Sequence, residues 1–321
     1  MRRFFLVFAA ILFISACGYL TESKPIMKQS DYEKMIAGSF DADYIGTDNC
    51  LFKCHAHDKI YENFKKSVHA EQINKETMLP LVNCETCHGP GSKAVDEIRE
   101  VNGEKQCNFN TLIDLKKLPA GAKNLTCLKC HTVSSTPNLA FWRGSSHDMA
   151  GVACSDCHRL HVSPNQKVLH DEQFDLCTSC HKKIKQDLNN VSHHPLKEKK
   201  MVCTDCHNPH GSVAEKLLKR ETVRDTCVYC HKEKGGPFVY EHADLMDDCN
   251  NCHKPHGAMN DNLLKKRDPI LCMNCHRGHH NSSTASMQGL SAANKSKFYT
   301  RCTDCHGAIH GTNLPGKKML R

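Results

Sequence analysis

Hydrophobic residues are concentrated in one short block at the start of the chain. Nine of the first sixteen residues are Leu, Ile, Val or Phe, and Phe4–Ile14 is an unbroken apolar run that follows Arg2 and Arg3. A membrane-spanning helix needs about 20 apolar residues, so this basic start and short run indicate a bacterial signal peptide over residues 1–16. The small residues before Cys17 resemble a lipoprotein cleavage box. We therefore expect Cys17 to become the lipidated first residue, the alternative being plain cleavage to a soluble product.

After residue 16 the hydrophobic pattern is too sparse to predict an ordinary packed core. Leu, Ile, Val and Phe make up about 18% of the remaining residues, below the usual level for a globular chain. Residues 17–43 are polar and are predicted to form a lipidated tether. Residues 112–121, LIDLKKLPAG, are predicted as a short amphipathic helix. No later segment is predicted to cross a membrane, so something other than aliphatic side chains must fill the interior.

The cysteines and histidines of the chain indicate what fills the interior. The chain has 22 Cys and 23 His. Nine stretches read Cys-x-x-Cys-His, and a tenth, Cys50–His55, has one extra residue between the cysteines. The paired cysteines are Cys50/Cys54, Cys84/Cys87, Cys127/Cys130, Cys154/Cys157, Cys177/Cys180, Cys203/Cys206, Cys227/Cys230, Cys249/Cys252, Cys272/Cys275 and Cys302/Cys305, and the histidines that follow are His55, His88, His131, His158, His181, His207, His231, His253, His276 and His306.

This motif is the attachment signature of c-type haem. Two cysteines form thioether bonds to the porphyrin, and the next histidine binds the iron from one face. A single match would also suit a redox dithiol or a zinc knuckle, but a histidine after every second cysteine is not expected of either. The sequence therefore predicts ten haem c groups, or nine if Cys50/Cys54 is not loaded. Cys107 stands outside the motifs and is expected to be inert or to form a disulfide.

A longer repeat supplies histidines for the other face of each iron. Two-motif units begin at Cys154, Cys203 and Cys249, and each has one spare histidine upstream and another three residues after its first motif. An iron with histidine on both faces is closed to substrate and suited to electron transfer. The predicted distal ligands are His147, His161, His193 or His194, His210, His242 and His256, then His69, His279 or His280, His310, and finally His170 or His57.

The motif count, the CHNPHG and CHKPHG units and the ending RCTDCHGAIHGTNLPGKKMLR resemble the MtrA/DmsE-type decahaem c cytochromes from residue 44 onward. The resemblance implies a mostly irregular fold with short α-helices, an extended haem wire, and two tandem pentahaem modules over residues 44–195 and 196–321. It also implies an outer-membrane β-barrel porin and an outer-surface multihaem cytochrome as partners, with cytochromes of the periplasm or inner membrane as donors. The extra residue in the first motif departs from the family pattern, as does the lack of a histidine shortly after His88.

The formal charge of +8 does not indicate a nucleic-acid partner, because ten haems carry propionates that bring the mature protein to about −4 when oxidised. The leading hypothesis is an electron conduit from the periplasm across or to the outer membrane, for a protein held in the periplasm or at the outer membrane by its lipid. A periplasmic donor to a dedicated terminal reductase is the second hypothesis. A multihaem reductase of nitrogen or sulfur oxyanions, with one open iron near Cys50/Cys54, is the third.

Overall fold

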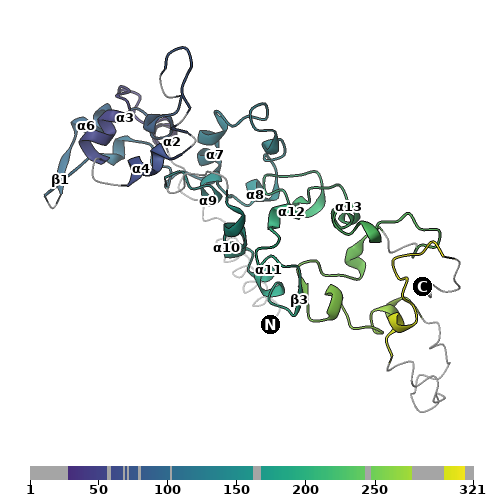
Figure 1. Ribbon diagram of the computed structural model, residues 1–321. Helices are drawn as coiled ribbons and strands as arrows, with labels where there is room; N and C mark the ends of the chain where they lie inside the picture. Colours follow the sequence, from purple (N-terminus) through teal and green to yellow (C-terminus); the bar gives the residue numbers. More distant parts are fainter. Residues whose placement is uncertain are drawn as a thin grey trace, which may run out of the picture. The chain divides into compact units, whose positions relative to one another are not determined.

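The computed structural model describes residues 28–55, 59–67, 69–70, 72–78, 81–101, 103–161, 168–242, 247–276 and 300–314. The chain divides into two compact units: unit 1 comprises Met1–Ala122 with His161–Pro164, and unit 2 comprises Lys123–Leu160 with Asn165–Arg321. In both, the described residues form short helical turns and two-residue or three-residue strands joined by irregular segments (Figure 1). The expected fold class, mostly irregular with short helices, is confirmed.

Unit 1 is built from short helices and one hairpin. Its elements are α2 (Gln29–Ala37), α3 (Thr47–Cys50), the π-helix η1 (Leu51–His55), α4 (Ile60–Lys65), α5 (Cys84–His88), α6 (Ser92–Asp96), β1 (Arg99–Val101), β2 (Glu104–Gln106), the 3-10 helix η2 (Phe109–Thr111) and the start of α7 (Ala120–Leu128). Strands β1 and β2 pair antiparallel, with Arg99 opposite Gln106.

A small hydrophobic cluster holds unit 1 together. Ile113, Leu118 and Ala122 are buried in it, and Met35 and Ile36 of α2 pack against them. Residues 29–37 therefore belong to unit 1 rather than to a tether. The predicted helix over residues 112–121 is wrong: residues 112–119 form turns and α7 begins only at Ala120. Pro119 cannot continue a helix from before it, and the Asp114 side chain accepts the backbone N–H of Lys116, which favours a turn.

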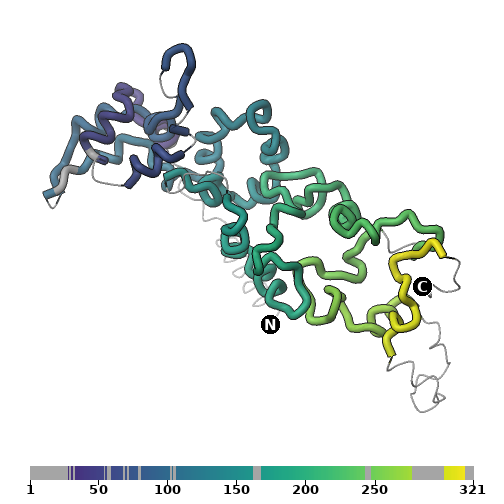
Figure 2. The backbone as a smooth tube through the Cα atoms, in the orientation of Figure 1, coloured from purple at the N-terminus to yellow at the C-terminus, as the bar shows by residue number. Residues whose placement is uncertain are grey.

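Unit 2 carries most of the attachment motifs. Its elements are η3 (Pro137–Leu139), α8 (Ser146–Met149), α9 (Cys154–Cys157), η4 (His170–Glu172), α10 (Gln173–Cys180), α11 (Lys182–Asp187), β3 (Ser192–His193), α12 (Cys203–Cys206), η5 (Glu215–Leu217), α13 (Val223–Val228), η6 (Lys232–Lys234), η8 (Cys249–Asn251), β4 (Gly257–Ala258), η9 (Asp261–Leu263), η10 (Cys272–Asn274) and η13 (Cys302–Asp304). Strands β3 and β4, distant in sequence, pair antiparallel within this unit (Figure 2).

The motifs begin helical turns because their own residues cap them. Asp156, Asp205 and Asp304 each stand immediately before the second cysteine of a motif. Their carboxylates accept the backbone N–H of the residue preceding the first cysteine, at 2.8, 2.9 and 3.1 Å respectively. This satisfies a donor that a short helix leaves unpaired. A helical turn then places residues i, i+3 and i+4 on one face, so both cysteines and the histidine project together.

Protein side chains alone make little core in the described part of the chain. The apolar side chains buried there include several alanines, and Leu188 is the largest that is completely buried. No helix among the described residues is long and apolar enough to cross a membrane. The boundary between the compact units lies at Ala122 rather than near Pro195, so the division into two pentahaem modules stays a prediction.

Candidate haem sites

Seven pairs of imidazole rings lie opposite one another in the described structure, with ring planes 15–28° apart in five pairs, 47° apart in His194–His231 and 64° apart in His147–His181. Each pair joins one histidine of an attachment motif to one histidine outside the motifs. The pairs and their centroid separations are His88–His161 (6.1 Å), His147–His181 (6.1 Å), His158–His210 (6.0 Å), His194–His231 (6.3 Å), His207–His256 (6.0 Å), His242–His276 (5.7 Å) and His253–His310 (6.2 Å).

These separations fit one iron atom between two imidazoles. A metal–nitrogen bond to histidine is about 2 Å long, and the coordinating nitrogen lies about 1.1 Å from the ring centre, so the expected centroid separation is about 6.2 Å. The spacing therefore suits bis-histidine haem, with the attachment histidine on one face and its partner on the other.

The pairing follows a rule that spans successive repeats. The upstream histidine of a repeat faces the second attachment histidine of the same repeat, as in His147–His181. The histidine three residues after the first motif instead faces the first motif of the preceding repeat, as His210 faces His158 and His256 faces His207. The second and third repeats thus each supply a ring to the repeat before, which ties neighbouring repeats together.

Backbone carbonyls hold two of the upstream histidines in the tautomer that binds metal through Nε2. Nδ1 of His147 donates to the Pro209 carbonyl at 2.8 Å, and Nδ1 of His194 donates to the Pro255 carbonyl. A proton held on Nδ1 leaves the Nε2 lone pair for the iron. These two prolines directly precede His210 and His256, so the next repeat also orients these ligands.

The attachment histidines of two repeats are oriented by a strained turn. His207 donates Nδ1–H to the Lys216 carbonyl and His253 donates to the Asn262 carbonyl, both at 2.8 Å. Lys216 and Asn262 have φ values of 55° and 53°, in the left-handed region that costs a non-glycine residue roughly 1–2 kcal/mol. Haem-motif spacing does not indicate these positions, but Leu-Leu-Lys directly follows Lys216 and Asn262 in both repeats and is a visible signal.

Burial keeps several of these rings neutral. It lowers the pKa of His207, His210, His256 and His310 below the ordinary histidine value, and neighbouring histidines lower the pKa of each further. The Lys216 carbonyl opposes this effect only in part at His207. A neutral imidazole has the lone pair that an iron ligand needs.

Between His193 and His194, the geometry favours His194. The ring of His194 lies 6.3 Å from that of His231. Both nitrogens of His193 are engaged elsewhere: Nδ1 lies 2.7 Å from the Asn190 carbonyl and Nε2 lies 3.1 Å from the Glu198 carboxylate. The Glu198 carboxylate, with help from the Asn190 carbonyl, raises the pKa of His193. His193 is the last residue of strand β3 and His194 follows it directly, and of the two it is the His194 ring that lies beside His231.

His170 also differs from the other predicted ligands. Its half-exposed ring lies 3.2 Å from the Asp171 carboxylate, and within the described residues it makes no ring contact with an attachment histidine. It lies near Cys203, whose motif histidine, His207, already faces His256. His69 is described but does not belong to the seven pairs. His57, His279, His280 and the lipidation candidate Cys17 lie outside the described residues.

The irregular first motif has a matching irregularity in the backbone. Residues Leu51–His55 form a π-helix, the one-residue expansion of an α-helical turn. In a π-helix, residues five apart take the relation that residues four apart have in an α-helix. The turn therefore absorbs the extra residue and restores the relation between Cys50 and His55.

The first cysteines of neighbouring motifs lie in contact. In a haem-loaded protein these thiols would be thioether sulfurs, which do not titrate. The contacts therefore show only where the motifs lie relative to one another. The contacting pairs are Cys50–Cys84, Cys127–Cys154, Cys177–Cys203, Cys227–Cys249 and Cys272–Cys302. Second cysteines approach within electrostatic range at Cys157–Cys180, Cys206–Cys230 and Cys252–Cys275. Within unit 2, motifs that are neighbours in sequence are thus neighbours in space.

Four of the predicted attachment cysteines, Cys54, Cys87, Cys130 and Cys305, do not take part in these contacts. The backbone of Cys54 belongs to η1, but its side chain lies outside the described part of the chain. Cys87 is half-buried within α5. Cys130 and Cys305 are exposed, as are the second cysteines Cys157, Cys180, Cys230 and Cys275. Haem attachment by the paired cysteines stays a prediction.

The backbone at these motifs nevertheless has the form that attachment needs. The N–H groups of Cys130 and Cys305 each donate to the carbonyl of the first cysteine of their motif, at 3.2 Å. The N–H groups of His131 and His306 donate to the same carbonyls, at 3.0 and 2.8 Å. Each motif thus completes a helical turn, which places its second cysteine and its histidine on the same side as the first cysteine.

Buried polar atoms give a second test of whether the residues present fit haem. In the described structure the Oγ of Ser67, the Nε1 of Trp142 and the Nε of Arg224 are buried without a hydrogen-bond partner. Such atoms are costly unless they are satisfied. Trp142 packs edge-on against His210, with the ring centroids 6.4 Å apart. Donors of this kind beside the ligand rings suit haem propionates, so the residues present fit the cofactor.

Glycines after the distal histidines permit the close approach between repeats. A Cβ on Gly211 would overlap the carbonyl of Phe141, and a Cβ on Gly257 would overlap the carbonyl of Asp187. Gly211 also has φ near 114°, a conformation that other residues rarely adopt.

We expect Gly211→Ala to destabilise the haem-loaded protein by about 3 kcal/mol, because the overlap displaces His210 and adds backbone strain. Thermal unfolding followed in the Soret band measures this loss. Gly121→Ala is the matched control, because nothing lies within 4 Å of the added Cβ. Equal melting of the two variants would show that the close approach is unimportant.

Cys107 is disulfide-bonded in the structure. This agrees with the expectation of a disulfide-forming thiol.

The motifs and the facing histidines define a multihaem c-type cytochrome, a class of electron-transfer protein. The family model "Doubled CXXCH motif" matches residues 147–186, 193–236 and 242–281, and "Cytochrome c554 and c-prime" matches residues 91–159. The multiheme cytochrome MtrA of Shewanella baltica (strain OS185) is 36% identical over 281 residues, which cover 86% of this chain and 81% of that protein. The chain belongs to the MtrA family of multihaem cytochromes. The three doubled-motif matches begin at His147, His193 and His242, as the repeat analysis predicts.

Proposed function

We propose that this protein conducts electrons between the periplasm and the outer membrane, and across that membrane when sheathed by a β-barrel porin. When bound, the haems supply reversible one-electron chemistry. The observation that carries the proposal is the set of seven facing histidine pairs. Irons held on both faces are closed to substrate, and the contacts between neighbouring motifs suit a continuous run of such centres.

The proposed sites extend the seven pairs to ten haems in an extended wire. His88, His158, His181, His207, His231, His253 and His276 bind iron from one face, with His161, His210, His147, His256, His194, His310 and His242 respectively on the other. For the irons of His55, His131 and His306, the sequence-based candidates remain His69, His279 or His280, and His57 or His170. Lipidation of Cys17 is proposed to hold the protein at the membrane surface.

All ten cysteine pairs are proposed as attachment sites. Cys54, Cys87, Cys130 and Cys305, which take no part in the contacts between motifs, are included because each completes a motif whose histidine follows directly.

Three kinds of partner follow from the proposed role. The similarity to MtrA supports a porin and an outer-surface multihaem cytochrome on one side, with periplasmic or inner-membrane cytochromes as donors. A role as a donor to a terminal reductase shares the same haem chemistry and differs only in the partner. A reductase would need its open iron at His55, His131 or His306, the attachment histidines outside the seven pairs.

Protease protection tests the conduit role. In intact cells, the haem-loaded protein is expected to co-purify with a β-barrel and to resist external and periplasmic protease until the barrel is removed. Deletion of the barrel gene should expose the protein to degradation, while a soluble periplasmic cytochrome serves as the unprotected control. Complete sensitivity in the presence of the barrel would support the reductase-donor role instead.

Intact mass spectrometry is expected to give ten covalently attached haems. The π-helical turn keeps Cys50 and His55 in an attachment geometry, so the first motif should be loaded. A variant carrying both Cys50→Ser and Cys54→Ser should then lose the mass of one haem. If the wild type and this variant both carry nine, the first motif does not bind haem.

A further inference from the structure

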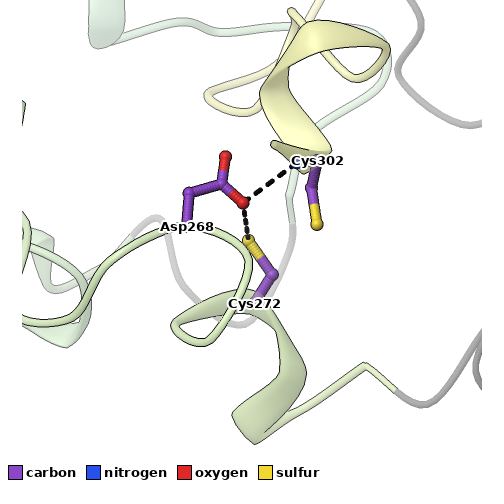
Figure 3. Close-up of side chains that lie close together, drawn as sticks. All are labelled: Asp268, Cys272 and Cys302. Atoms are coloured by element: carbon purple, nitrogen blue, oxygen red, sulfur yellow. Dashed lines mark hydrogen bonds between the residues drawn. The ribbon is translucent and has the colours of Figure 1, made fainter. Parts of the chain in front are cut away.

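The contact between the last two described motifs contains a buried carboxylate. Asp268 is 8% exposed, and its Oδ1 accepts the backbone N–H of Cys302 at 3.0 Å and lies 3.8 Å from the Sγ of Cys272 (Figure 3). Its Oδ2 accepts the backbone N–H and the hydroxyl of Thr303, at 3.2 and 2.8 Å. Asp268 therefore joins the turn before one motif to the start of the next.

Other motif pairs have a neutral side chain in the same role. The residue lies three or four positions before the first cysteine of one motif and accepts hydrogen bonds from the start of the next. Thr47 accepts from the N–H of Cys84 at 3.4 Å, and Asn124 accepts from the N–H of Cys154 at 2.8 Å. Gln173 accepts from the N–H and the hydroxyl of Thr204, at 3.3 and 2.9 Å. A neutral acceptor is thus sufficient for docking.

The charge at this position changes along unit 2. In the Cys227–Cys249 pair the position is occupied by Arg224, whose guanidinium donates to the Gly235 carbonyl and acts electrostatically on Cys249. The Cys272–Cys302 pair has the anionic Asp268. Docking needs only a neutral acceptor, so the negative charge of Asp268 is not required to hold the two motifs together.

The carboxylate of Asp268 is ionised. Burial alone would raise its pKa, but hydrogen bonds from Cys302 and Thr303 outweigh burial and hold the pKa below its ordinary value. Asp268, Cys272 and Cys302 have the spacing of a metal site, with their ligand atoms within 4.8 Å of one another. Both sulfurs belong to haem-attachment motifs, however, so they are thioethers in the mature protein and are weak ligands.

We propose that Asp268 lowers the reduction potentials of the haems attached at Cys272/Cys275 and Cys302/Cys305. A thioether sulfur is bonded to the porphyrin, so a fixed anion in contact with it disfavours the extra electron of the reduced state. The effect is strong because a buried charge is poorly screened by water. The inference rests on haem attachment and electron transfer, and it adds an energy step at the C-terminal end of the proposed wire.

Redox titration of purified haem-loaded variants tests this role. Asp268→Asn removes the charge and keeps an acceptor oxygen. At a fixed potential, the ratio of reduced to oxidised haem for one or two haems should rise about tenfold, which is 59 mV for a one-electron couple. Asp261→Asn is the matched control, because this carboxylate is 73% exposed and pairs with Arg301 at 3.4 Å. It should leave the titration curve unchanged.

A gain of charge gives the reciprocal test. Gln173→Glu places a carboxylate at the equivalent position of the Cys177–Cys203 pair and should shift one or two haems about tenfold in the opposite direction. Each variant is first shown by intact mass to have the wild-type haem number. If Asp268→Asn loses haem, Gln173→Glu decides alone.

An unchanged curve for Asp268→Asn, a shift no larger than that of Asp261→Asn, or an unchanged curve for Gln173→Glu would each overturn the proposal. These titrations need neither porin nor membrane, so their failure is distinct from failure of the conduit role.

Discussion

A His194→Ala variant is expected to contain one high-spin iron, while His193→Ala keeps every iron that is low-spin in the wild type. His194 faces His231 at 6.3 Å and has its Nδ1 proton directed at the Pro255 carbonyl. His193 instead lies against Asn190 and Glu198. Loss of the His194 ring leaves the iron of His231 with an open face, whereas loss of the His193 ring removes only surface contacts.

Electron paramagnetic resonance of the oxidised proteins measures this difference, and the visible spectrum gives an independent record of spin state. The two variants differ by one sequence position and have the same change in composition, so each controls for the other. Imidazole added to His194→Ala should restore the low-spin signal. A high-spin signal in His193→Ala with a wild-type spectrum in His194→Ala would reverse our assignment.

The haem-free chain is expected to be unfolded. In the described structure, buried apolar side chains are few and several are alanines, and the hydrophobic cluster of unit 1 is built on Ile113, Leu118 and Ala122. Burial contributes about 25 cal/mol per Å² of apolar surface, so this core cannot offset the entropy of ordering the chain. The large apolar faces of porphyrins, fixed by two thioethers and two histidines, are needed to stabilise the fold.

Expression of residues 17–321 without export prevents haem attachment and provides the test. Far-UV circular dichroism of this material should show little helix, and trypsin should digest it much faster than the exported, haem-loaded chain. The exported chain is the control, because its amino-acid sequence is identical. A compact, protease-resistant haem-free protein would show that the polypeptide has a sufficient core of its own.

Short-range chemistry made the attachment sites predictable. Both thioethers and one iron ligand of each haem come from five or six consecutive residues, so the motif is complete wherever the chain places it. Histidines repeated at fixed offsets, such as His210 and His256, could likewise be predicted as candidate ligands. The sequence also predicted a fold with little regular structure, because so few aliphatic residues follow the first sixteen.

Long-range packing decided which histidines face one another. His210 lies three residues from the motif of His207, yet it faces His158 of the preceding repeat. Sequence spacing does not specify that His210 lies opposite His158. This placement depends on the close approach of the backbone at Gly211 and on the hydrogen bond between His147 and the Pro209 carbonyl. Contacts with Glu198 and the Pro255 carbonyl likewise place the ring of His194, rather than that of His193, beside His231. The attachment chemistry was therefore determined locally by the sequence, whereas the second ligand of each paired iron was decided by tertiary contacts, because that ligand must reach across the porphyrin from another part of the chain.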